Sequence, residues 1–230
     1  MKIDSNGSDI ATGLAFDGIG SLTKQGNGSL TLNGITTHTG GTSVTGGTLI
    51  LGATGGIAGT GAIDIAAGAT LDASASTFSL LAGQSLTGNG TFAGTFSVGT
   101  GTLAPGNSIG TLSFTNNIVL GASSISNFEI QKIGLALTSD LATTTGTLTL
   151  GGTLNVSSLG GTFANGDTWN LFDAASISGN FTGVNLPSVS GNDYWDTSKL
   201  AVNGTITFVP EPGATLLGLF GLALLARRSR

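Results

Sequence analysis

The sequence of 230 residues has no cysteine, one histidine and only 8% charged residues. Without cysteine, neither a disulfide framework nor a thiolate metal site can form. Ordinary soluble domains carry about 25% charged residues, and disordered chains combine high charge with few aliphatic residues. Because 39% of this chain is hydrophobic, intrinsic disorder is disfavoured.

Positive charge is especially scarce. Seven Lys and Arg residues face 12 Asp and Glu residues, for a net charge of -5, and three of the seven are among the last four residues. The rest of the chain therefore has no basic surface to follow a phosphate backbone, and we expect no nucleic-acid partner. With so few catalytic residue types, we expect no enzyme, no metal and no cofactor.

Small residues dominate instead, with 40 Gly, 34 Thr and 24 Ser. A short unit of Gly, a small polar residue and an aliphatic residue recurs, for example at residues 28–32, 47–51, 110–114 and 146–150. Alternation with a period of two places the aliphatic residues on one face and Thr or Ser on the other. The pattern predicts an all-β body of short, half-buried strands.

The spacing of these units predicts how the strands are arranged. Leu30, Leu49 and Leu71 follow one another at a loose period of about 20 residues, which suits one coil of a right-handed parallel β-helix, or solenoid. Leu30, Leu49 and Leu112 are then expected to point inward. A β-sandwich is the alternative, because Asn-Gly hairpin turns are present at residues 33–34 and 203–204.

Changes in composition along the sequence divide the chain into three parts. Residues 1–126 are expected to be solenoid repeats, residues 127–208 a C-terminal β cap with more aromatic residues, and residues 209–230 a separate tail. Residues 1–6 include a basic residue but no apolar signal-peptide core. We therefore expect a truncated start, with residues 10–16 as the incoming strand of a longer solenoid.

The tail has three consecutive components: a glutamate between two prolines, an uncharged apolar run and an arginine cluster. They are Pro210, Glu211 and Pro212; residues 213–226; and Arg227, Arg228 and Arg230. Fourteen helical residues span about 21 Å against roughly 30 Å of hydrocarbon, but snorkelling arginines and bilayer thinning accommodate a short span. We expect one short transmembrane helix with a cytoplasmic C-terminus; the alternative is a buried terminal helix.

This order of components resembles the PEP-CTERM sorting signal. The resemblance implies export and processing by an exosortase-type membrane peptidase, with the proline, glutamate and arginine residues of the tail as the sorting signal. The protein would be anchored in the inner membrane before processing, and then be at the cell surface or outside the cell. It also implies an association with exopolysaccharide or biofilm matrix.

A second resemblance covers the solenoid region. Residues 22–32 read LTKQGNGSLTL, and residues 39–44 and 47–49 read TGGTSV and GTL. They resemble the autotransporter-associated β-strand repeat, in which an aromatic residue is common at the position of His38. Residues 103–112, LAPGNSIGTL, resemble the turn that follows such repeats. The resemblance implies a non-enzymatic, exported, β-helical surface protein with a structural or adhesive role.

Few residues are candidates for chemistry. Asp64 and Asp72 are the candidate pair for a carbohydrate-active enzyme, which needs two converging carboxyl groups, although solvated strand acids explain them as well. His38 has no Cys, His or carboxylate near it in sequence, so a metal or nucleophile-activating role is disfavoured. The segment 193–196, Asp-Tyr-Trp-Asp, joins aromatic rings to carboxylates, as some carbohydrate or calcium contacts do, but such rings more often fill the small core of a cap. A carbohydrate-active enzyme and a glycan-binding module therefore remain alternatives to the structural or adhesive role.

Overall fold

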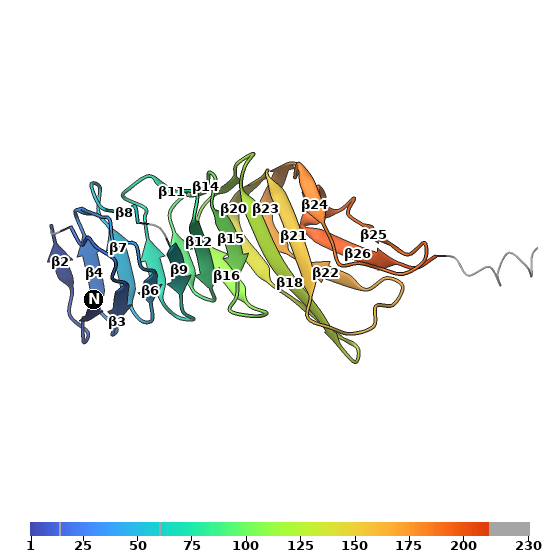
Figure 1. Ribbon diagram of the computed structural model, residues 1–230, viewed down its shortest axis with the longest axis horizontal. Helices are drawn as coiled ribbons and strands as arrows, with labels where there is room; N and C mark the ends of the chain where they lie inside the picture. The colour runs from blue at the N-terminus through green and yellow to red at the C-terminus, as the bar shows by residue number, and fades with distance from the viewer. Residues whose placement is uncertain (14, 60, 212–230) are drawn as a thin grey trace, which may run out of the picture.

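The computed structural model describes residues 1–13, 15–59 and 61–211, and these form a rod of stacked β-strands. Figure 1 shows the strands of successive coils side by side along the long axis, with the N-terminal coils at one end and the last strands at the other. Among the described residues only α1 (Leu200–Asn203) is α-helical. The prediction of an all-β body is therefore confirmed.

Two long parallel sheets form the first and second faces of the rod. The first face consists of β1 (Lys2–Asp4), β3 (Leu22–Gln25), β6 (Thr42–Val44), β9 (Gly61–Ile65), β12 (Gln84–Gly88), β15 (Thr102–Pro105), β18 (Ile125–Ile133), β21 (Thr153–Ser158) and β24 (Gly183–Asn185). The second face consists of β2 (Ile10–Thr12), β4 (Ser29–Leu32), β7 (Thr48–Leu51), β10 (Thr70–Asp72), β13 (Thr91–Ala93), β16 (Thr111–Phe114), β20 (Leu141–Leu150) and β23 (Phe172–Gly179).

Shorter parallel strands follow the second-face strands and close the coils. They are β5 (Ile35–Thr36) with β8 (Gly56–Ile57), and β11 (Phe78–Leu80) with β14 (Phe96–Val98) and β17 (Ile118–Leu120). Parallel pairing between strands one coil apart is typical of a β-helix and differs from the hairpin pairing of a sandwich. The β-helix-like arrangement is confirmed; the right-handed sense of the coil stays a prediction.

The coils are of two lengths. In the first part of the chain Leu30 lies opposite Leu49 and Leu49 opposite Leu71, so that one coil takes about 20 residues. Further on, Ile125 lies opposite Thr153 and Thr153 opposite Gly183, so that one coil takes about 30 residues. We call residues 1–124 the narrow coils and residues 125–185 the wide coils. The period read from the sequence therefore holds for the narrow coils only.

Inward-facing aliphatic and aromatic side chains stack into a continuous core. One row runs through Leu30, Leu49, Leu71, Phe92 and Phe114, each opposite the next in adjacent second-face strands. All five are buried, and the Thr and Ser residues between inward positions are half-buried or exposed. The inward direction predicted for Leu30, Leu49 and Leu112 is confirmed.

An antiparallel sheet with an aromatic core covers the end of the wide coils. Its strands are β22 (Thr168–Asn170), β26 (Thr205–Val209) and β25 (Tyr194–Asp196). Trp169 packs edge-to-face on Phe163 and Trp195, with ring centroids 5.3 and 5.6 Å apart. Strand β18 pairs with β15 and with β21, so the parallel sheet of the first face continues past residue 126. The division of the chain into a solenoid and a cap at that residue stays a prediction.

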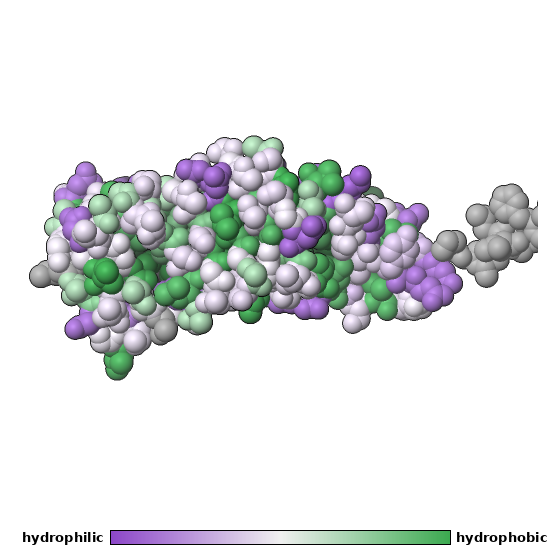
Figure 2. Space-filling view, turned by 90° about the horizontal axis from the view of Figure 1, so that it is seen from above, coloured by the Kyte–Doolittle hydropathy of each residue, from purple (hydrophilic) through white to green (hydrophobic). Residues whose placement is uncertain are grey.

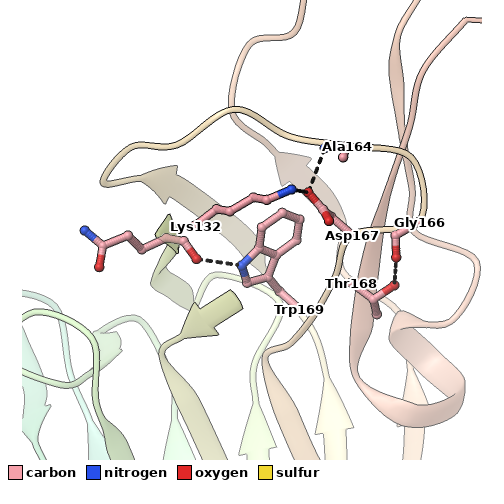
Figure 3. A network of polar contacts seen from close by, with 7 residues as sticks. Lys132, Ala164, Gly166, Asp167, Thr168 and Trp169 are labelled. Atoms are coloured by element: carbon pink, nitrogen blue, oxygen red, sulfur yellow. Dashed lines mark hydrogen bonds and ion pairs between the residues drawn. The ribbon is translucent and has the colours of Figure 1, made fainter. Parts of the chain in front are cut away.

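Polar contacts join this end sheet to the wide coils (Figure 3). Lys132 Nζ lies 2.6 Å from Asp167 Oδ2, which also accepts a hydrogen bond from the Ala164 N–H at 2.7 Å. The indole N–H of Trp169 donates to the Gln131 carbonyl at 3.2 Å. Because Lys132 and Gln131 are in β18, the contacts fix the end sheet to the first face.

Candidate functional site

A groove of about 460 Å³ opens on the outer side of the first face, where narrow coils meet wide coils. Strands β12, β15, β18, β21 and β24 and the loop after β15 line it. Elsewhere the surface seen in Figure 2 is mostly of intermediate hydropathy, as expected from exposed Thr, Ser and Gly, with scattered apolar and polar side chains. The groove brings together three asparagine amides and the carboxyl groups of Glu129 and Asp140.

A row of three stacked asparagines forms one side of the groove. Asn127, Asn155 and Asn185 are opposite one another in β18, β21 and β24. Asn155 Nδ2 donates to Asn127 Oδ1 at 2.9 Å, and Asn185 Nδ2 donates to Asn155 Oδ1 at 2.8 Å. We call these three residues the asparagine ladder. It exists because in-register parallel pairing stacks identical side chains about 4.8 Å apart.

The floor of the groove is a small residue in the same outward row. Ala104 lies opposite Thr87, and it follows Leu103, which pairs with Ser126. Ala104 thus stands between Thr87 and Asn127, where its methyl group leaves space that a longer side chain would fill. The half-buried Leu186 adds apolar surface to the lining, which also includes the buried Pro105.

A tight loop forms the rim. Gly106 and Ser108 both have positive φ, +85° and +114°, and a Cβ on Gly106 would collide with the Ser108 carbonyl oxygen. Asn107 Nδ2 donates to Asp64 Oδ1 at 3.0 Å, and Thr87 Oγ1 donates to the same oxygen at 3.3 Å. Asp64 therefore holds the rim loop against the first face.

A buried carboxyl group holds the other end of this loop. Asp140 is only 2% exposed; its Oδ1 accepts the Gly110 N–H at 2.9 Å and its Oδ2 accepts the Glu129 N–H at 2.7 Å. Burial raises the pKa of Asp140 to about 7, although these two hydrogen bonds oppose the rise. Both oxygens of Asp140 accept hydrogen bonds from backbone N–H groups, so its role is to position the rim. Glu129, which is less buried, contributes its carboxylate to the groove surface.

The structure does not bring Asp64 and Asp72 together. Asp64 lies on the first face and Asp72 on the second. Asp72 Oδ1 accepts from the N–H and the hydroxyl of Ser74, at 2.9 and 2.6 Å. Each carboxylate thus has local partners of its own, and the pair considered for glycoside chemistry does not converge.

His38 is buried between coils. Its Nε2 lies 2.9 Å from Thr42 Oγ1, and its Nδ1 has no hydrogen-bond partner among the described residues. Burial lowers the pKa of His38 and so favours the neutral ring. No group of three or more His, Asp or Glu side chains suited to a metal occurs within the described ranges.

The aromatic pair of the segment 193–196 divides between core and surface. Trp195 packs in the end sheet and donates from Nε1 to the Pro187 carbonyl at 2.9 Å. Tyr194 is 54% exposed, while Asp196 Oδ1 accepts the Ser198 N–H at 2.8 Å. A binding surface at this segment would rest on Tyr194, without a second exposed ring from the segment.

Of the sorting-signal residues, the structure describes Pro210 and Glu211. They follow β26 directly; Glu211 N donates to Asp193 Oδ1 at 2.9 Å, and its Oε1 accepts from Asn192 Nδ2 at 2.6 Å. Lying outside the described residues are Pro212, the apolar run 213–226, Arg227, Arg228 and Arg230. Up to Glu211, no helix has the length and apolar character needed to span a membrane.

Comparison with known proteins identifies one repeat. Residues 22–51 match the family model of the passenger-associated-transport repeat. The match begins at β3 and ends at β7, so it covers about one and a half narrow coils. It supports the resemblance to autotransporter-associated repeats and indicates a passenger-like extracellular protein. No curated protein matches the chain.

Proposed function

We propose that this protein is a non-enzymatic structural or adhesive component of the cell surface or extracellular matrix. The observation that carries the proposal is the passenger-associated-transport repeat at residues 22–51, which coincides with stacked parallel coils. Such coils present a long, regular surface of hydroxyl and amide groups around a mainly apolar core. A regular surface of this kind suits many weak contacts with a matrix polymer, including exopolysaccharide.

We further propose that a PEP-CTERM signal sorts the protein. Support comes from Pro210, which directly follows the last residue of β26, and from the sequence beyond it: Glu211, Pro212, the apolar run and the arginines. The short helix expected over residues 213–226 would hold the tripeptide near the membrane. An exosortase-type peptidase would then cut close to it and release a body without an anchor.

The sorting proposal is tested in a host that contains an exosortase, with a functional signal peptide supplied. We expect the released wild-type protein to lack residues 213–230 by intact-mass measurement. Replacing Pro210, Glu211 and Pro212 together by alanine should leave uncleaved protein in the inner membrane. The control variant Ser188→Ala/Ser190→Ala, in an exposed loop of the end sheet, should be processed normally. Extracellular wild-type protein that retains residues 213–230 would refute the mechanism.

The surface role itself is tested by protease treatment of intact cells. We expect the rod to be degraded from outside while cytoplasmic proteins stay intact. Incubation of the purified protein with matrix polysaccharides, followed by a reducing-end assay, tests the non-enzymatic part of the proposal. New reducing ends that form with the wild type but not with Asp64→Asn or Asp72→Asn would replace it with a carbohydrate-active enzyme.

A further inference from the structure

We propose that the groove over Ala104 binds an uncharged glycan chain, which lies across the strands along the asparagine ladder. The inference rests on the proposed function only in requiring that the first face be outside the cell. It names a binding site and a class of ligand for the adhesive role.

The ladder has hydrogen-bonding capacity left for a ligand. A side-chain amide has two N–H donors and an oxygen with two lone pairs. Asn155 uses one donor toward Asn127 and one lone pair toward Asn185, so that further donors and acceptors remain on all three residues. They repeat at the strand spacing of about 4.8 Å, which is close to the length of one sugar ring in an extended chain. Sugar hydroxyls both donate and accept, and they suit such a row.

The rest of the lining fits the other surfaces of a sugar. Ala104 and Leu186, both half-buried, present apolar groups to the groove, against which the C–H faces of sugar rings can pack. Binding sites for small ligands commonly combine such an apolar lining with a few fixed polar groups. Asp64 and Asp140 fix the rim from both ends, so the groove is formed before the ligand arrives.

The charge of the groove selects an uncharged ligand. Glu129 lines the groove, Asp64 lies behind its rim, and no Lys or Arg is among the described lining residues. Acidic polysaccharides and phosphate esters are therefore repelled. A peptide that adds as a further strand is disfavoured over most of the groove, because β15, β18 and β21 each pair with a strand on both sides. Among the lining strands only β24, the last of the sheet, pairs on one side.

Binding is measured on the full chain by titration calorimetry and by NMR of side-chain amides. The probes are cellohexaose, laminarihexaose and maltohexaose, with an oligogalacturonate of equal length as the acidic counterpart. We expect at least one neutral hexaose to bind and to shift the amide signals of Asn127, Asn155 and Asn185. The oligogalacturonate should bind at least tenfold more weakly.

Three variants test the location. Asn155→Ala removes the middle of the ladder and should weaken binding roughly tenfold, the loss expected for one or two hydrogen bonds. Ala104→Tyr fills the floor and should abolish binding, while both variants retain the wild-type circular dichroism because these positions face outward. The control Ser43→Ala, in the same outward row but outside the groove, should bind as the wild type does.

Two results would overturn the inference. One is a failure of all three neutral hexaoses to bind. The other is binding that survives Asn155→Ala and Ala104→Tyr but is lost in Tyr194→Ala, which would place the site on the end sheet. Either result leaves surface exposure and processing unaffected, whereas a failure of the proposed function shows in the protease and mass assays while binding in vitro persists.

Discussion

The narrow and wide coils accommodate a lysine of the first face in different ways. In the narrow coils Lys24 points inward and is fully buried, and its Nζ donates to the carbonyls of Gln25, Gly26 and Gly46 at 3.0, 2.9 and 2.9 Å. In the wide coils Lys132 pairs with the carboxylate of Asp167. A short coil brings carbonyls of tight corners close enough to surround an ammonium group. In a long coil the corners are farther apart, and the ammonium group is instead neutralised by the Asp167 carboxylate, next to the end sheet.

The largest effect is expected for a charge placed in the core of a narrow coil. Leu49→Asp puts a carboxylate between Leu30 and Leu71, where no partner is available, and should lower the free energy of unfolding by roughly 5 kcal/mol. Urea denaturation measures this loss. The matched control Thr48→Asp, on the outward side of the same strand, should cost less than about 1 kcal/mol. Equal losses in the two variants would contradict the assigned faces.

Removal of an indole from the end sheet is expected to act locally. Trp169→Ala deletes a ring that is buried against Phe163 and Trp195 and should cost about 4 kcal/mol. Because stacked coils contact mainly their neighbours, hydrogen exchange should accelerate in the end sheet and wide coils and stay slow in β4 and β7. Uniform acceleration along the rod would show that the two regions unfold as one unit.

The pH dependence of stability should reveal the raised pKa of Asp140. Its pKa of about 7 in the folded protein lies above the ordinary value of 3.8, so the folded state keeps a proton that the unfolded state releases. Stability from this group is therefore full below about pH 4 and declines as the pH rises to about 7, by on the order of 3 kcal/mol. Thermal unfolding from pH 4 to pH 8 should show this decline in the wild type but not in Asp140→Asn.

Other carboxyl groups act in a different pH range. Hydrogen bonds from Asn6 and Ser29 lower the pKa values of Asp4 and Asp9, so their contributions are lost only as the pH falls below about 4. A decline above pH 5 that persists in Asp140→Asn would exclude Asp140 as its cause.

The two lysines compare the coils directly. Lys132→Met leaves the Asp167 carboxylate without its cation and should cost about 2–3 kcal/mol, whereas Lys24→Met leaves only carbonyls unsatisfied and should cost about 1–2 kcal/mol. Urea denaturation at low and high salt measures both. A larger loss of stability for Lys24→Met than for Lys132→Met would show that the carbonyl cluster stabilises the fold more than the ion pair does.

The smallest effect is expected at Asp72. Within the part of the chain that the structure describes, its carboxylate accepts hydrogen bonds from Ser74 on the surface of the second face. Asp72→Asn should therefore change stability by less than about 0.5 kcal/mol. The same urea measurement decides it. A loss above about 1 kcal/mol would reveal a role for this acid that its contacts do not explain.

The sequence is sufficient to predict the narrow coils. The spacing of Leu30, Leu49 and Leu71 yields the coil length, and alternation yields the inward face. The asparagine ladder is not predictable in this way, because its three members are spaced by the longer wide coil, outside the period read from the narrow coils. Lys24 is missed for another reason: alternation puts it inward, but only the folded corner shows carbonyls that can bind its ammonium group. The site thus depends on register between distant strands, which local patterns do not determine.

The number of strands stacked in the first face sets the length of that face along the rod. Nine described strands from β1 to β24 are spaced about 4.8 Å apart, so the face extends roughly 40 Å from its first strand to its last. Each inserted coil would lengthen the rod by one such increment and leave the end sheet and the groove unchanged. Repeat number can therefore set the length of the rod without altering the groove.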